Sequence, residues 1–586
     1  MYYLSLVLGM PNGDITTNSQ RAQLILLLLI VLFSLSYFIS NMGADLIRAG
    51  EGRAAEIARE MLERGNFILP SLNYVVDGHS LTKPPLYHWM LIVTGAPFDW
   101  QNWAVRLTTV VSAFGLIWMV FLFGRQMFGY RAALFSALVL STSIVFLENS
   151  SAARMDVFFS FLILSSIYCF WMAINRNHES WWIYGFYALS GLGVLTKGPV
   201  GLLFPALVAI ILFLSSNSKN NWNSFVPLKG VLLFLVVTLP WYVLFAISAP
   251  PGLASNFIFG QLAHWWAGSS NVAASGGKPV TYYLPHIIVG LFPWSLLLPA
   301  AVVIGFRVSR EEGNAGIKSM LIWFLGGLVL FSIGGKKAAR YLLPIMAPFA
   351  LIIGFYLDRI GETISKRHGV VLNLSSVLVM LFVVAITGLV AAIYIDPDWV
   401  INDLFKGQKK GGASQLKAGI DILLQNPLPV LMIVGLMFIA SIVTVAGSVK
   451  RNLYLMVFGL AVVIWMLVWP FSLTIKPALQ QQMSPRLVAE KIRDMLPPDT
   501  SLYGGGGDYQ HSIRWYLERN ITMEPVGKLY NRVLHEPASW VLLMDKKSPQ
   551  ERLLNSGRNA MRWQIEYYHV TLFPGLAQKT DERREN

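Results

Sequence analysis

The chain of 586 residues has few cysteines and few charged residues, and both shortages narrow the class of protein. Its single cysteine, Cys169, lies inside an apolar run, which excludes a disulfide framework and a thiolate metal site. Only 13% of the residues are charged, 55% are hydrophobic, and the mean hydropathy is +0.53. Because apolar runs long enough to cross a bilayer recur along the chain, we predict an integral membrane protein built mainly from helices.

Acidic residues are the scarcer charged type, since 32 Asp and Glu stand against 46 Lys and Arg, a net charge of +14. Such an excess is also found in proteins that bind nucleic acid. Here the basic residues lie mainly in short loops between apolar runs, where cytoplasmic orientation and anionic lipid headgroups account for them. We therefore exclude nucleic acid as a partner.

The predicted fold class is a polytopic α-helical membrane protein with about thirteen transmembrane helices. No small-residue cleavage pattern follows the first apolar run, which indicates an uncleaved span rather than a removed signal. The transmembrane domain would cover residues 1–475, including a long external loop at 43–105. The expected spans are 23–42, 106–124, 131–148, 156–174, 182–197, 199–215, 229–247, 286–306, 318–334, 341–357, 370–394, 428–447 and 453–474.

The distribution of basic residues predicts the orientation of these spans. Loops rich in Lys and Arg alternate with loops that lack them, and the basic loops are expected to face the cytoplasm. The N-terminus is then inside and the C-terminal region outside. The residues that define the basic loops are Arg125, Arg131, Arg176, Lys219, Lys229, Arg307, Arg310, Arg359, Lys366, Arg367, Lys450 and Arg451.

A second set of basic residues falls at the external ends of the spans, against this bias. Taken singly, each could be an interfacial anchor whose side chain extends to the headgroups. Lys197 argues against that explanation, because Leu-Thr-Lys-Gly-Pro interrupts an apolar stretch with few residues between two spans, where a lysine is costly unless it faces a polar cavity. Together these cations predict an anion-binding surface. They are Lys83, Arg154, Lys197, Lys336, Lys337 and Arg340.

The external loop at 43–105 contains a helix signal and a lysine motif. Residues 51–64 have apolar residues at helical spacing between charged ones, with Gly65 as a stop, so this helix should lie flat on the membrane surface. In residues 81–89, Leu-Thr-Lys-Pro-Pro-Leu-Tyr-His-Trp, two prolines fix Lys83 beside aromatic residues. A fixed cation with apolar neighbours at a bilayer surface suits a lipid phosphate.

Two carboxylates are candidates for chemistry at this face. Glu51 precedes the predicted surface helix, where it could act in catalysis or cap the helix. Asp156 stands at the outer edge of the fourth span, where it could act as a base or interact favourably with the helix dipole. Both alternatives stay open.

An external segment at 248–285 adds aromatic and histidine residues, among them His264, Tyr283 and the adjoining His286. Aromatic residues gather at bilayer interfaces in any case, so they are weak evidence for a sugar site. A metal site at His264 and His286 is an alternative without a supporting ligand spacing, so no cofactor is assigned, and a divalent cation stays open.

Residues 476–586 are polar and predict a small external α/β domain. Strands are expected at 540–544 and 564–569, and helices at 485–495 and 511–518. The glycine run at 504–507 lacks the Gly-Lys-Ser/Thr of a phosphate loop, so we interpret it as a turn between a strand and a helix.

Taken in order, several motifs carry a family resemblance over nearly the whole chain. The chain resembles the lipid A aminoarabinosyltransferase family of C-type glycosyltransferases, which use polyprenyl-phosphate sugars and are related to the protein mannosyltransferases. The motifs are Glu51-Gly-Arg with the following helix, Lys83-Pro-Pro-Leu-Tyr-His-Trp, Ala104-Val-Arg106, Arg154-Met-Asp156, Leu195-Thr-Lys-Gly-Pro-Val, Tyr283-Leu-Pro, Gly290-Leu-Phe-Pro-Trp294, Lys337 to Tyr341-Leu-Leu-Pro, and 502–517.

This resemblance implies an inner-membrane enzyme whose active site faces the periplasm. It would transfer a sugar, such as 4-amino-4-deoxy-L-arabinose, from an undecaprenyl phosphate donor to a lipid A phosphate or a related lipid or glycan acceptor of the cell envelope. The alternative within the same fold is transfer to a protein or glycan hydroxyl. Asp156 and Glu51 would be the catalytic residues. The substrate-binding residues would be Lys83, Arg154, Lys197, Lys337, Arg340, Tyr341, Tyr283 and His264.

One departure from the family pattern concerns the acidic pair that normally precedes Gly-Arg. Gly50 replaces its first member, which leaves only Glu51. A hydroxyl acceptor would benefit from a carboxylate base, whereas a phosphate acceptor is already anionic. Asp156 is therefore the preferred base and Glu51 the second choice. The competing class is a transporter or lipid flippase with a basic cavity, although one half of the chain shows no repeat in the other.

Overall fold

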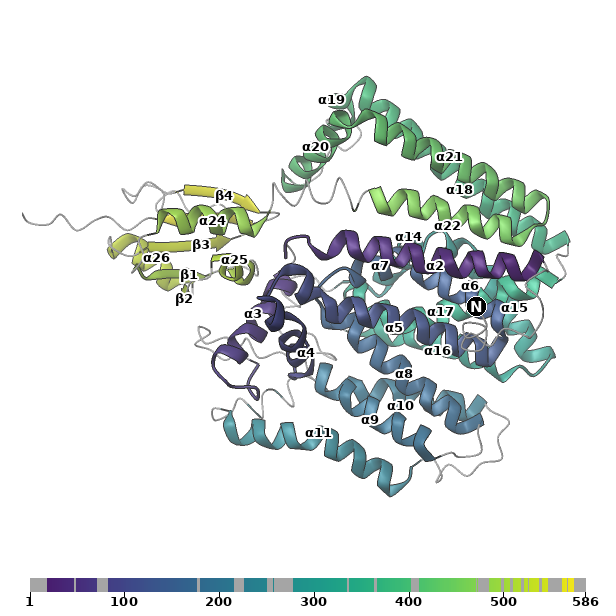
Figure 1. The fold of residues 1–586 in the computed structure, drawn as a ribbon, viewed down its shortest axis with the longest axis horizontal. Helices are drawn as coiled ribbons and strands as arrows, with labels where there is room; N and C mark the ends of the chain where they lie inside the picture. The colour runs from purple at the N-terminus through teal and green to yellow at the C-terminus, as the bar shows by residue number, and fades with distance from the viewer. Residues whose placement is uncertain are drawn as a thin grey trace, which may run out of the picture.

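The computed structural model describes residues 18–46, 49–70, 83–175, 180–215, 226–249, 254, 257, 278–334, 337–362, 366–401, 410–470, 472, 484–496, 500–505, 510–517, 521–524, 526–536, 540–545, 561–565 and 568–573. Most of these residues are helical, and a small sheet lies near the C-terminus. Figure 1 shows the long helices running roughly side by side, with the α/β unit at one end of the bundle.

Apolar helices form the bundle. In hydrocarbon no water is available to the backbone N–H and C=O groups, and a helix satisfies them with its own hydrogen bonds. They are α2 (Asn18–Met42), α5 (Asn102–Phe128), α6 (Tyr130–Ser141), α7 (Ile144–Ser150), α8 (Met155–Asn175), α9 (Ser180–Lys197), α10 (Val200–Ser215), α11 (Leu228–Ser248), α14 (Tyr283–Gly290), α15 (Leu298–Glu311), α16 (Ala315–Ile333), α17 (Leu343–Glu362), α18 (Lys366–Ile395), α21 (Pro427–Val449) and α22 (Leu453–Pro470).

Within the described residues, eight helices are long and apolar enough to cross a membrane, and the pair α6 and α7, bent by 64°, would make a ninth. Each of the thirteen predicted spans coincides at least in part with an apolar helix or with two successive ones. The additional predicted spans fall on α9, α10, α14 with α15, and α22, which are shorter, more polar or interrupted. The polytopic helical class is confirmed, and thirteen as the number of crossings stays a prediction.

Close helix contacts in the bundle depend on small residues. A Cβ atom on Gly354 of α17 would lie 2.6 Å from the carbonyl oxygen of Ala132 and 2.0 Å from the Oγ of Ser136, both on α6. The two backbones therefore touch, as in other membrane bundles that use small residues at helix interfaces. Large buried side chains fill the space between other helices, and the indole of Trp294 donates to the hydroxyl of Thr142 at 2.9 Å.

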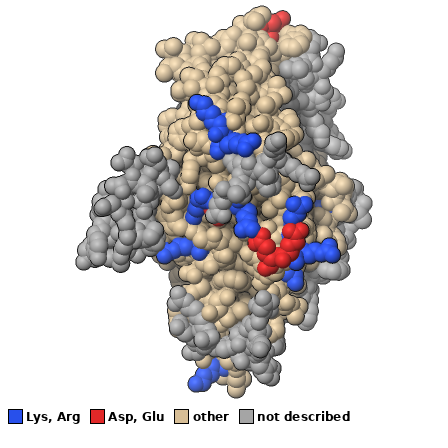
Figure 2. Space-filling model, turned by 90° about the vertical axis from the view of Figure 1, so that its right-hand side faces the viewer, with Lys and Arg blue, Asp and Glu red and all other residues tan. Residues whose placement is uncertain are grey.

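The helix ends predicted to face the cytoplasm lie together at the end of the bundle opposite the α/β unit. Arg131, at the start of α6, pairs with Asp358 near the end of α17, and Arg359 pairs with Glu312 after α15. Figure 2 looks at this end and shows Lys and Arg side chains around a small acidic patch. The loops of Arg131 and Arg359 therefore share one side of the bundle, whereas Arg176 and Lys219 lie outside the described residues.

The C-terminal α/β unit has a five-stranded sheet with the order β2-β1-β3-β5-β4. β1 is parallel to β2 and β3, so Tyr503 lies between Thr522 and Val541, whereas β5 is antiparallel to β3 and β4. The predicted strand at 564–569 was wrong in its bounds, because it falls on the ends of two strands. The elements are α24 (Pro485–Met495), β1 (Leu502–Gly505), α25 (Gln510–Leu517), β2 (Ile521–Met523), α26 (Val526–His535), β3 (Trp540–Asp545), β4 (Met561–Ile565) and β5 (Tyr568–Phe573).

Shorter helices lie outside the bundle proper. α4 (Leu86–Gly95) precedes α5, and α20 (Lys410–Gln425) lies between α18 and α21 in the chain. The single turns are η1 (Ala96–Phe98), η3 (Val280–Tyr282), η4 (Trp294–Leu296), η5 (Ala339–Leu342) and α19 (Pro397–Trp399).

The predicted surface helix is present as α3 (Ala49–Glu63), but its environment was predicted wrongly. It packs against α4 on one side and α25 on the other, and Figure 1 shows it beside the α/β unit. Glu56 and Glu60, expected on an open polar face, are 1% and 3% exposed. The reason is that their carboxylates pair with an arginine of the C-terminal unit, so α3 is enclosed between two parts of the protein rather than lying on a membrane surface.

Candidate functional site

A cavity of about 720 Å³ opens where α3, α8, the α9–α10 turn, α16 and the start of α17 meet. Its described wall contains one carboxylate, that of Asp156, and five cationic side chains. The excess of positive charge suits an anionic ligand. The cations are Arg53, Lys83, Arg154, Lys197 and Arg340.

Asp156 occupies the first turn of α8, at the polar end of an apolar helix. Its side chain is 7% exposed, and its two oxygens have different partners. Lys197 Nζ lies 2.7 Å from Oδ1, and Arg340 Nε lies 3.4 Å from Oδ2. A buried carboxylate between two cations stays ionised, because separating it from them would leave uncompensated charges in the interior.

Lys197 is placed by a tight turn between α9 and α10. Gly198 adopts φ +85°, a conformation that favours glycine, and a Cβ atom on Gly201 would lie 2.2 Å from the backbone of Gly193. The two helices therefore meet backbone to backbone just beside the lysine. Its ammonium also lies 4.7 Å from the ring of Phe159 and 5.4 Å from that of Tyr341, so aromatic faces and a carboxylate together hold the cation.

Arg340, which lies on η5, also contacts Asp156. Its guanidinium lies 5.4 Å from the ring of Tyr341, and its side chain is 38% exposed. Arg340 is more exposed than Lys197, and its guanidinium has five N–H donors, so Arg340 has the greater capacity for further hydrogen bonds.

The Lys83 motif forms another part of the wall. Pro84 and Pro85 are buried, and the buried hydroxyl of Tyr87 lies 3.0 Å from that of Thr109 on α5, which fixes the segment to the bundle. His88 also lines the cavity and is 3% exposed. Burial lowers the pKa of His88 to about 4, with the Pro84 carbonyl opposing the shift, so the ring is neutral at physiological pH.

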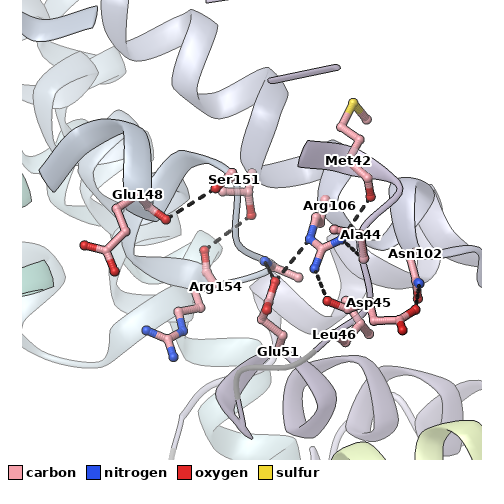
Figure 3. Close-up of polar contacts among 12 residues, drawn as sticks. Met42, Ala44, Asp45, Leu46, Glu51, Asn102, Arg106, Glu148, Ser151 and Arg154 are labelled. Atoms are coloured by element: carbon pink, nitrogen blue, oxygen red, sulfur yellow. Dashed lines mark hydrogen bonds and ion pairs between the residues drawn. The ribbon is translucent and has the colours of Figure 1, made fainter. Parts of the chain in front are cut away.

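Glu51 lies beside the cavity but is not among the residues that line it in the described structure. Its Oε1 accepts hydrogen bonds from the backbone N–H of Ala153 at 2.8 Å and from Nε of Arg106 at 3.2 Å. Figure 3 shows the glutamate turned toward these two groups. Glu51 therefore ties α3 to α5 and to the segment before α8. The remaining N–H groups of Arg106 donate to the carbonyls of Met42, Ala44 and Asp45.

Gly50, where the family pattern has an acid, lines the cavity on the first turn of α3. A Cβ atom at this position would lie 3.4 Å from Nε of Arg154 and 3.7 Å from its Nη2. These are ordinary contact distances, so a side chain would fit, and a carboxylate here would reach the guanidinium. With glycine, this position supplies no carboxylate to the cavity wall, which Arg154 also lines.

The structure brings together six of the predicted site residues, which all line the cavity. Lys337 and Tyr283 lie beyond this lining, where Lys337 Nζ donates to the carbonyl of Gly334 at 2.8 Å, and Tyr283 Oη accepts from the N–H of Ala338 at 3.4 Å. His264 and Lys336 lie outside the described residues. The six are Lys83, Arg154, Asp156, Lys197, Arg340 and Tyr341.

The lining residues that were missed from the sequence include Arg53, His88 and Phe159. A signal existed for Arg53, because Gly50, Arg53, Ala54 and Ile57 follow the i, i+3, i+4, i+7 spacing of one helix face. From sequence, however, Arg53 is one of the charged residues within 51–64 and is expected on the polar face. His88 and Phe159 carry no local signal, since each is also typical of an ordinary core position.

Among the described residues, no three His, Cys, Asp or Glu side chains gather in a way that could hold a metal ion. His286, one of the two histidines considered as ligands, has Nδ1 2.8 Å from the carbonyl of Tyr282. The predicted partner His264 falls in the part of the chain that is not described.

The wall of the cavity changes character away from the cations. Its apolar lining comes from Leu203, Phe204 and Leu207 of α10 and from Leu330 and Phe331 of α16, with the rings of Phe204 and Phe331 stacked at 5.7 Å between centroids. Leu203 and Leu207 are 59% and 41% exposed, so the apolar side of the cavity continues to the outer surface of the bundle. The cavity therefore combines a cationic end with an apolar exit, which matches the two halves of a lipid phosphate.

Comparison with known proteins agrees with this geometry. Residues 82–244 match the family model described as dolichyl-phosphate-mannose-protein mannosyltransferase. An undecaprenyl phosphate-alpha-4-amino-4-deoxy-L-arabinose arabinosyl transferase of Edwardsiella ictaluri is 28% identical over 381 residues, which cover 64% of this chain and 66% of that protein. The same identity is found with the transferase of that name from Pseudomonas aeruginosa strain UCBPP-PA14, over 63% of this chain and 66% of that protein.

The matched region therefore spans just under two thirds of the length of these relatives. The structural similarity covers more of the chain than the sequence match does. The crystal structure of ArnT from Cupriavidus metallidurans bound to undecaprenyl phosphate superposes with a TM-score of 0.73 at 21% identity, covering 94% of this chain and 98% of that one. The resemblance inferred from the motifs is thus confirmed as a resemblance: the chain is similar to the ArnT-like membrane glycosyltransferases, and part of it matches the model of the related protein mannosyltransferases.

Proposed function

We propose that this protein transfers a sugar from an undecaprenyl phosphate donor to a lipid A phosphate or a related cell-envelope acceptor. The observation that carries the proposal is the cavity itself, whose cationic end surrounds one buried carboxylate and whose other end is apolar and open to the bundle surface. The relatives named as 4-amino-4-deoxy-L-arabinose transferases indicate which sugar to test first.

The reaction is a displacement at the anomeric carbon of the donor sugar. An acceptor oxygen forms a bond to this carbon while the bond from the carbon to the phosphate oxygen breaks, and the electron pair leaves with the lipid phosphate. Direct displacement inverts the anomeric centre. Lys83, Lys197 and Arg340 stabilise the charge that grows on the leaving phosphate, because fixed cations in a cavity poor in water act without reorganisation.

Asp156 has the second role in this mechanism. A hydroxyl acceptor must lose a proton, and Asp156 is the cavity carboxylate placed to receive it. A phosphate acceptor is already largely ionised near pH 7, and Asp156 then orients Lys197 and Arg340, to which its two oxygens are joined. Glu51 is a less suitable base, since its contacts with Arg106 and Ala153 hold it outside the lining.

The apolar exit gives the donor's hydrocarbon chain a route that does not require polar groups to be desolvated. The chain would pass between Leu203 and Leu207 of α10 and the lining side chains of α16 toward the membrane. The phosphate would then remain at the cationic end, with the sugar beneath α3.

Release of undecaprenyl phosphate tests the function. The purified protein in detergent should convert an undecaprenyl phosphate sugar to free undecaprenyl phosphate when an acceptor is present, with 4-amino-4-deoxy-L-arabinose as the first sugar and lipid A as the first acceptor. Lys197→Ala should abolish most of this release. A transporter needs two compartments and would release none, so binding without turnover over a panel of sugars and acceptors would contradict the proposal.

The site is proposed to face the periplasm from the bacterial inner membrane. The support is that the basic helix ends gather opposite the cavity and the C-terminal unit, as expected for a cytoplasmic side. A reporter that is active only outside the cytoplasm, fused after residue 586, should be active. An inactive but well-expressed fusion would reverse the orientation.

A further inference from the structure

We propose that Arg514, in the C-terminal unit, is a positioning residue for sugar transfer, which acts by holding α3 in place as one wall of the cavity. The inference rests on the proposed function. It begins from two sets of residues on α3, because Gly50, Arg53, Ala54 and Ile57 line the cavity, whereas Glu56 and Glu60 contact the C-terminal unit.

Arg514 contacts both glutamates from α25. Its Nε lies 3.0 Å from Oε1 of Glu56, and its Nη2 lies 2.6 Å from Oε1 of Glu60. All three residues are at most 6% exposed. The two carboxylates are one helical turn apart, so a single guanidinium fork joins successive turns of α3.

Each glutamate also has a second arginine nearby in the chain, on α3 or directly after it. Arg59 lies 2.5 Å from Glu56, and Arg64 lies 2.9 Å from Glu60. Arg59 belongs to α3 and Arg64 directly follows it, so neither can fix the position of the helix relative to the rest of the protein. Arg514 is the basic partner in this cluster that comes from another element, so it supplies the positional restraint.

The backbones of α3 and α25 are also in contact. A Cβ atom on Gly52 would lie 2.3 Å from Oγ of Ser512 and 2.8 Å from its Cα. Because the second of these atoms belongs to the backbone, a rotamer change alone cannot make room for a methyl group. Gly52 therefore sets the distance between the two helices, directly before the cavity residue Arg53.

Two aromatic residues of α25 extend the contact. The ring of Trp515 lies 4.7 Å from the guanidinium of Arg59. The hydroxyl of Tyr516 accepts a hydrogen bond from the N–H of Leu46 at 2.7 Å and donates to Asn102 at 3.2 Å. The helix α25 thus holds three segments together: α3, the segment before α3, and the start of α5.

The groups assigned to the donor phosphate belong to other elements. Asp156 is on α8, Lys197 ends α9, and Arg340 is on η5. A displacement of α3 should therefore disturb the part of the cavity assigned to the sugar and the acceptor, and should leave binding of the lipid phosphate intact. This separation distinguishes a positioning role from general structural support.

Two substitutions test the contact by different routes. Gly52→Ala pushes α25 away without changing any charge, and Arg514→Lys keeps the charge but replaces the fork by a single ammonium. Each should lower kcat/KM for the acceptor by about tenfold or more, since small displacements of reacting groups are costly. The affinity for undecaprenyl phosphate alone should stay within about twofold of wild type. Gly527→Ala on α26, where a Cβ atom meets nothing within 4 Å, is the matched control.

Hydrogen exchange supplies a readout that does not depend on activity. Backbone amides at 49–63 should exchange faster in Gly52→Ala and Arg514→Lys, while those of α8 should not change. Unchanged exchange of α3 in both variants would overturn the inference, and so would a loss of undecaprenyl phosphate binding in parallel with turnover. If wild type is inactive, or if Lys197→Ala is fully active, the proposed function fails instead, and the exchange result still decides whether Arg514 restrains α3.

Discussion

Asp156 and Glu51 make an instructive pair, because they are buried carboxylates of neighbouring segments with different surroundings. Their exposed fractions are 6% and 2%, and each is paired with a basic side chain. Glu51 contacts an arginine and a backbone N–H that belong to the protein framework. Asp156 contacts two cations that face a cavity of about 720 Å³.

The difference shows that neither burial nor ion pairing identifies a catalytic carboxylate. Both features are also produced by structural ion pairs, since a buried charge needs a partner wherever it lies. The discriminating feature is space beside the pair into which a substrate can enter. Substitutions that remove one carboxylate charge at a time should therefore lower turnover at Asp156 and stability at Glu51.

The largest effect is expected for Asp156→Asn, which keeps the size of the side chain and removes its charge. Turnover should fall by roughly 10²–10⁴-fold, the range for loss of a general base. Affinity for undecaprenyl phosphate should hold or increase, because Lys197 and Arg340 lose a competing anion. Steady-state kinetics with a separate binding measurement would check this. Full activity on both phosphate and hydroxyl acceptors would remove Asp156 from the mechanism.

Lys83→Ala should have the next largest effect. Removing one charge-stabilising group should reduce transfer by ~10²-fold or more, without loss of membrane insertion. Lys450→Ala, in an exposed position at the end of α21, is the control for removing a lysine. Equal turnover in the two purified variants would make Lys83 an interfacial anchor.

Glu51→Gln should change stability more than chemistry. The glutamine can still accept a hydrogen bond from Ala153, but Arg106 loses its ionic partner and keeps its carbonyl acceptors. We expect a loss of about 1–3 kcal/mol in unfolding free energy, as for a weakened buried pair. Turnover per folded molecule should stay within about threefold. Glu63→Gln, whose side chain is 64% exposed on the same helix, should change neither. Normal stability with lost turnover would transfer the catalytic role to Glu51.

The smallest effect concerns pH and His88, the neutral residue in the cavity wall. Burial lowers the pKa of His88 to about 4, from 6.5, so the unfolded chain binds the proton more tightly. Stability from this group is complete above pH 6.5 and declines as the pH falls toward 4. Between pH 6.5 and 5.5 the loss should be about 1 kcal/mol.

Thermal unfolding of wild type and His88→Asn at several pH values checks that sign. The variant should lose less stability than wild type on acidification, whereas His535→Asn, at an exposed position, should follow wild type. Parallel curves for wild type and His88→Asn would show that the ring is not buried as a neutral base.

The fold was largely predictable because its main signal is local. A long apolar run needs only its own backbone hydrogen bonds to be stable in a bilayer, so the spans on α2, α5 and α8 follow directly from sequence. The burial of α3 was not predictable in this way. Its charged face looks like any solvated face until Arg514, which lies about 450 residues further along the chain, is brought beside it.

The residues of the site also divide into those that local sequence predicts and those that it does not. Lys197 and Asp156 could be found because a charge inside or at the edge of an apolar run is costly and needs a reason. Arg53 was hidden among the charges of α3, and His88 has no charge to attract notice. The structural role of Glu51 required knowledge of where Arg106 lies, which no local pattern of either residue supplies.

The junction between α3 and α25 also constrains the order in which the protein can mature. Ribosomes add about 5–20 residues per second, so Glu56 and Glu60 precede Arg514 by roughly half a minute to a minute and a half. During that interval α3 has no external arginine, and its acidic face must remain hydrated. Chains that stop before α25 would keep this face on their surface, because Arg514 is never added.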